Sequence, residues 1–127
     1  MQLNMKTKIL SYSGEPIPSG PQYPDPENPD VMIKPKDLTL GDMCIAAFNN
    51  QYEGSEKLDA MKKVHRGIVS QEIYNALKDD ASGMVDMLQE DIVDVKELMN
   101  RFYTPMALMK AFELLDPKPA SADKKAS

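Results

Sequence analysis

The clearest hydrophobic pattern in the chain begins at residue 40. Apolar residues recur there at i, i+3, i+4, i+7 and i+8, as Leu40, Met43, Cys44, Ala47 and Phe48. Thr39 suits the N-cap position, because its hydroxyl can accept a hydrogen bond from a first-turn backbone N–H. Asp42 adds negative charge where the helix dipole is positive. The pattern predicts an amphipathic helix against which the later elements pack.

Upstream of this helix the hydrophobic period is that of a strand. Residues 3–12 alternate apolar and polar side chains, which predicts a half-buried strand. A second apolar run, Val31 to Ile33, is short and is expected to pair with the first strand at an edge. Two strands alone are marginal in water, so this ribbon must pack on the helices or pair with another copy.

Six prolines fall between residues 15 and 30. Each removes a backbone donor and fixes φ, so we expect an extended surface loop rather than a helix or a central strand. The segments PSGP, PQYP and PENP match the spacing of proline-rich ligands for aromatic grooves. We favour a stiff connector or arm, and keep a recognition peptide as the alternative.

Three further helices are predicted after the first. Residues 56–77 have helical spacing, with Ser55 as the N-cap, and we prefer one helix through Gly67 to two shorter ones. Residues 85–88 are expected to be extended, and a helix follows over residues 89–102 with Asp and Glu in its first turn.

The last predicted helix spans residues 105–115. Thr104 can cap it, and Pro105 suits the first helical position. The helix is apolar nearly all round, so it must be buried on most sides, either as a central core helix or as a helix shared with another subunit. Both alternatives stay open at this stage.

These elements predict a single α+β domain over residues 1–116. We expect a small N-terminal two-stranded β-ribbon packed on a bundle of about four helices, which 127 residues with 42% hydrophobic content can support. Residues 117–127 are small, charged and proline-containing, and are predicted to be a disordered tail.

Composition narrows the possible partners. A net charge of −5 disfavours non-specific binding to nucleic acid or to anionic membranes. No apolar run is long enough for a transmembrane helix, and the N-terminus lacks the apolar core of a signal peptide, so we expect a cytoplasmic protein. Methionine is abundant, with 10 residues. It suits either a core or an adaptable partner surface, and we favour the core.

Candidate chemistry is sparse. Cys44 is the only cysteine and lies on an apolar stripe, so we interpret it as a small buried hydrophobic residue. The alternative, a catalytic thiol, would need His65, the only histidine, as its base. The basic cluster around Arg66 and the carboxylates of Asp91 and Asp94 are interpreted as solvated faces. The chain has no phosphate-binding glycine loop, nucleophile elbow or paired metal ligands, so we expect no enzyme, cofactor or metal.

Three segments resemble a group of small bacteriophage and prophage proteins: LTLGDMCIAAF, then EKL with HRGIVSQEIYNA, then EDIVDVKELMNRFYTPMALMKAFELLDP. That group has a short N-terminal β element, a TLGD-type helix start and a tyrosine–Ser/Thr–proline junction before the last helix. The resemblance covers residues 38–117. Gln89 replaces a typical Thr cap, and the loop from Pro16 to Pro29 is longer than in the group. The resemblance implies a phage origin, hence the host cytoplasm, and carries over no functional residues.

The leading functional hypothesis is a non-enzymatic, phage-encoded protein-interaction module that associates with itself. It could serve as a virion or tail assembly accessory protein that binds another phage protein. The alternative is an acidic inhibitor of a host enzyme or defence complex. We expect no binding to nucleic acid or membrane. The candidate interface residues come from the last helix and the second strand: Met106, Met109, Phe112, Leu115, Val31 and Ile33.

Overall fold

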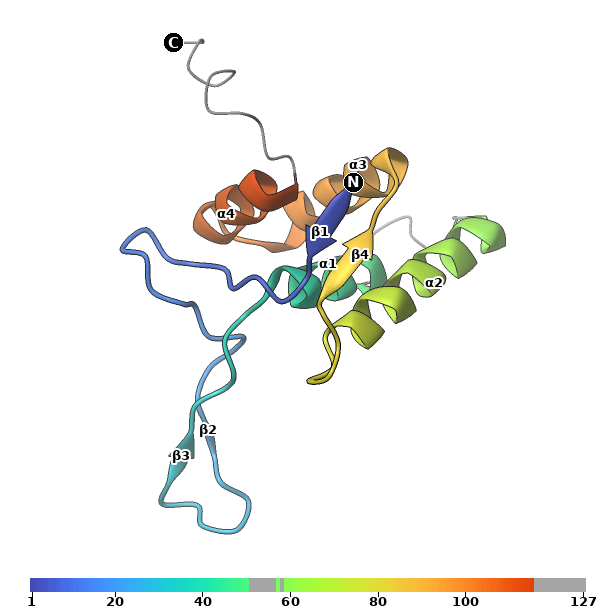
Figure 1. Cartoon of the computed structure of the whole chain (residues 1–127). Coiled ribbons are helices and arrows are strands. Elements are labelled where there is room, and N and C mark those ends of the chain that lie inside the picture. Colours follow the sequence, from blue (N-terminus) through green and yellow to red (C-terminus); the bar gives the residue numbers. More distant parts are fainter. Residues whose placement is uncertain (51–56, 58, 116–127) are drawn as a thin grey trace.

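A computed structural model of the chain describes residues 1–50, 57 and 59–115. Within them are four helices and two small antiparallel sheets, one beside the helices and one on a hairpin that projects from them (Figure 1). The helices are α1 Leu40–Asn49, α2 Ala60–Ala76, α3 Gln89–Phe102 and α4 Pro105–Leu115. The strands are β1 Gln2–Asn4, β2 Tyr23–Pro24, β3 Met32–Ile33 and β4 Met84–Asp86. The predicted α+β class with a four-helix bundle is confirmed.

Helix α1 is the central element. Its start is fixed by a capping box, in which the Asp42 backbone N–H donates to Thr39 Oγ1 (3.2 Å) and the Thr39 N–H donates to the Asp42 carboxylate (3.1 Å). Helices α2, α3 and α4 all pack against α1. The local cap signal therefore begins the helix where the sequence predicted, and its apolar stripe forms the middle of the fold.

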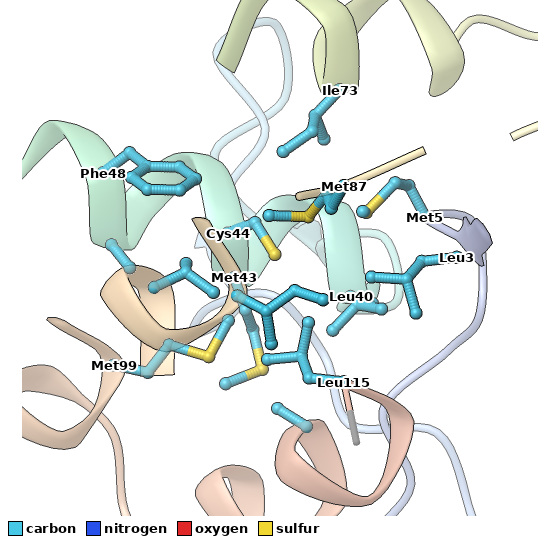
Figure 2. Packing of buried hydrophobic residues seen from close by; sticks show 14 of the residues in the cluster. Leu3, Met5, Leu40, Met43, Cys44, Phe48, Ile73, Met87, Met99 and Leu115 are labelled. Carbon is cyan, nitrogen blue, oxygen red and sulfur yellow. The ribbon is translucent and has the colours of Figure 1, made fainter. Parts of the chain in front are cut away.

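The core is rich in sulfur-containing side chains. Met5, Met43 and Met99 are fully buried together with Cys44 and Leu115, and Figure 2 shows them meeting between α1 and its neighbours. Five of the ten methionines are nevertheless exposed: Met1, Met32, Met61, Met84 and Met109. Assigning methionine mainly to the core was thus wrong for half of these residues.

The predicted strand pairing is wrong. β1 pairs with β4, in a register that places Leu3 opposite Val85, and β3 pairs with β2 instead of with the first strand. The first strand also ends early, because a turn follows Asn4, whose side chain accepts from the Lys6 N–H. The extended segment predicted near residue 85 exists, and it is the true partner of the N-terminus.

The proline-dense segment folds into a long hairpin, residues 19–36, here called the arm (Figure 1). Three backbone segments meet at its root. The Ile9 N–H donates to Leu38 O, the Leu38 N–H to Ile17 O, and the Ile17 N–H to Ile9 O, at 2.7–3.0 Å. Ile9 is fully buried, and Ile17 and Leu38 pack partly against the core. This closed triangle anchors the root of the arm, and the segment predicted to be an extended surface loop folds as a hairpin.

The later helices follow the predicted pattern with differences at their ends. α2 is a single helix through Gly67, as predicted, and begins at Ala60 with Asp59 as its cap. The expected start at Ser55 and Glu56, and the predicted tail 117–127, lie outside the described residues. α4 buries only its small-residue face and Leu115 within its own chain, and leaves larger side chains partly exposed. It is therefore not the central core helix that was one of the two alternatives.

Candidate interaction surfaces

Ion pairs between α2 and α3 form the main titratable cluster in the part of the chain that the structure describes. The Arg66 guanidinium donates twice to the Asp94 carboxylate, at 2.9 Å each, and His65 Nε2 lies 2.7 Å from Asp91 Oδ1. Arg66 and Asp91 are buried. The prediction that these residues form solvated faces is therefore wrong for Arg66 and Asp91. The burial of each is possible because its polar group has a hydrogen-bond partner on the facing helix.

The thiol of Cys44 is not placed for catalysis. The side chain is fully buried, and burial raises its pKa to about 12. His65 instead meets Asp91 on an exposed part of α2. Cys44 therefore acts as a small core hydrophobe, as interpreted from the sequence.

Among residues 1–50, 57 and 59–115, no group of three or more His, Cys, Asp or Glu side chains is arranged to hold a metal ion. None of the helices described there has both the length and the apolar character needed to cross a bilayer.

Helix α4 carries four of the six candidate interface residues. Met109 is exposed, and Met106 and Phe112 are partly exposed, with Lys96 Nζ 5.3 Å from the centre of the Phe112 ring. Leu115 is fully buried in the core of its own chain, so it cannot belong to an exposed contact face. The other two candidates lie on the arm, away from α4 (Figure 1). The structure thus divides the predicted interface between two separate surfaces.

The end of the arm exposes apolar side chains. Tyr23, Val31 and Met32 have exposed fractions of 47%, 47% and 52%, and Ile33 is partly buried. Tyr23 pairs with Ile33 across the hairpin, and Pro24 pairs with Met32. Successive strand residues point to opposite faces, so apolar side chains lie on both faces of the ribbon. We call residues 22–33 the arm tip.

The arm tip is also acidic. It contains Asp25, Glu27 and Asp30 and no Lys or Arg. The Asp25 carboxylate accepts the Glu27 N–H at 2.9 Å and helps close the terminal turn. None of the three acids has an ion-pair partner within the described chain. The tip therefore combines apolar contact area with uncompensated negative charge.

An open pocket of about 390 Å³ lies between α1 and α2, next to the root of the arm. Its apolar lining is Ile45, Ala46, Tyr74 and Leu77, and its charged lining is Lys36, Asp42 and Lys78. We call it the arm-root pocket. Lys36 pairs with Asp42 at 3.4 Å, and Lys78 lies 5.9 Å from the centre of the exposed Tyr74 ring. The pocket could accept an apolar group that carries negative charge.

Two of these features, the arm tip and the arm-root pocket, have only weak signals in the amino-acid sequence. Tyr23 is the one aromatic residue inside the proline-dense segment, and this isolated aromatic could have marked the tip. The arm-root pocket joins residues from the arm, α1 and the end of α2, and no short sequence pattern reveals such a meeting.

Comparison with known proteins adds no relative: no protein-family model, curated protein or solved structure matches this chain. The resemblance to phage proteins stays a prediction.

Proposed function

We propose that this protein is a non-enzymatic interaction module that associates with further copies of itself through its arm. The observation that supports this most is the arm tip, which exposes Tyr23, Val31 and Met32 at the end of a hairpin directed away from the helical body (Figure 1). A surface of this kind fits contact with another protein better than it fits stabilisation of its own fold.

The energetics of the arm support a role outside the monomer. Ordering each residue costs about 1–2 kcal/mol of backbone entropy, and an isolated two-stranded ribbon is at best marginally stable. The triangle at Ile9, Ile17 and Leu38 fastens the root, but beyond it the tip has no core to bury its apolar side chains. A partner that covers the tip would supply the missing burial.

The biological setting we propose is phage assembly. The resemblance of residues 38–117 to small phage and prophage proteins supports a phage origin, and a self-associating module with a projecting arm suits an assembly accessory protein.

The experiment is sedimentation velocity over a range of concentrations. The double variant Val31→Ser/Met32→Ser removes exposed apolar groups of the tip. We expect it to raise the dissociation constant of self-association at least tenfold, because burying each of these side chains contributes about 1.5–3 kcal/mol. Tyr12→Ser is the matched control, because Tyr12 is exposed but lies outside the tip.

Met109→Ser tests the surface on α4. If Met109→Ser dissociates the protein and the tip variant does not, the contact lies on α4.

A second candidate function is supported by the charge of the tip. Asp25, Glu27 and Asp30 could present an acidic surface to a basic host enzyme or defence complex. Such binding would weaken steeply as salt rises, whereas an apolar contact would be insensitive to salt. Co-purification of a host enzyme that is released by salt, with a monomeric wild-type chain, would favour this function over self-association.

A further inference from the structure

We draw no further inference here: the strongest candidate, the exposed apolar side of α2 that carries Met61, Val64 and Ile68, has no partner among the residues that the structure describes, and nothing in the structure shows what covers it.

Discussion

Two glycines in helices have opposite surroundings, and this difference can be measured. A Cβ added to Gly41 in α1 would lie 3.0 Å from the Cβ of Met5 and 2.9 Å from a methyl group of Leu77, whereas a Cβ on Gly67 in α2 would meet nothing within 4 Å. We expect Gly41→Ala to lower the free energy of unfolding by about 1–3 kcal/mol through overpacking. Gly67→Ala should raise it by about 0.5–1 kcal/mol, since alanine favours an exposed helix interior. Urea unfolding measures both, and equal effects at the two positions would contradict the packing described for α1.

Cys44 reports on the integrity of the core. Its raised pKa of about 12 means that the folded chain keeps the thiol protonated at pH 8, so iodoacetamide should modify the native protein far more slowly than the urea-unfolded protein. An equal rate of modification in the two states would show that the thiol is accessible in the native chain.

The same residue gives a pH dependence whose sign is defined. The unfolded chain releases the thiol proton near pH 9.0 and the folded chain near pH 12, so between these values the unfolded state binds fewer protons. The contribution of Cys44 to stability is therefore fully present below pH 9 and falls by about 1.4 kcal/mol per pH unit above it. In urea unfolding, the stability difference between wild type and Cys44→Ala should shrink as the pH rises from 9 to 12. A constant difference would contradict the burial of this thiol.

At the scale of elements, the arm should be separable from the body. The root triangle of Ile9, Ile17 and Leu38 belongs to the core, whereas residues 21–33 make no part of it. Replacing residues 21–33 with Asn-Gly, a sequence suited to a tight hairpin turn, should keep the helical circular dichroism signal and change the melting temperature by less than about 5 °C, equivalent to roughly 1 kcal/mol. Loss of cooperative unfolding would mean that the arm stabilises the body.

Elements with local signals could be predicted from the sequence, and pairings between distant segments could not. Thr39 with Asp42, and Thr104 with Pro105, lie within one helical turn of the starts they define, and both starts are where they were expected. The partner of β1 is separated from it by about eighty residues, and period-2 alternation does not reveal which strand pairs with which. The apolar run predicted as its partner, Val31 to Ile33, lies in the arm, where β3 pairs with β2.

The candidate interface residues, too, could be predicted from the sequence only where a local pattern marks them. Val31 was identified from its short apolar run and does lie on the exposed tip, although the run pairs with Tyr23–Pro24. Leu115 was identified from the apolar character of α4, but helical periodicity alone does not tell which side of such a helix meets the core. The Arg66–Asp94 pair is not predictable for a related reason: each residue lies on a polar helix face, and only the position of the facing helix shows that the two side chains meet.

At the scale of the whole molecule, charge and shape combine in one arrangement. A chain of net charge −5 concentrates at the tip of its arm three acids that have no ion-pair partner among the described residues, next to exposed apolar side chains. Its body buries a methionine-rich core around α1, while other methionines stay exposed, including Met32 at the tip. Flexible methionine side chains suit a surface that adapts to a partner. These features support an account in which the body is a scaffold and the arm makes the contact.

The most direct test of this account is the mass of the arm-shortened chain, with Asn-Gly in place of residues 21–33, compared with wild type by sedimentation velocity at matched concentrations. The account predicts that wild type sediments as an oligomer, at a multiple of the mass of its 14.2 kDa chain, and that the shortened chain sediments as a folded monomer. If both proteins sediment with the same number of chains, the arm does not mediate self-association and the central claim is wrong.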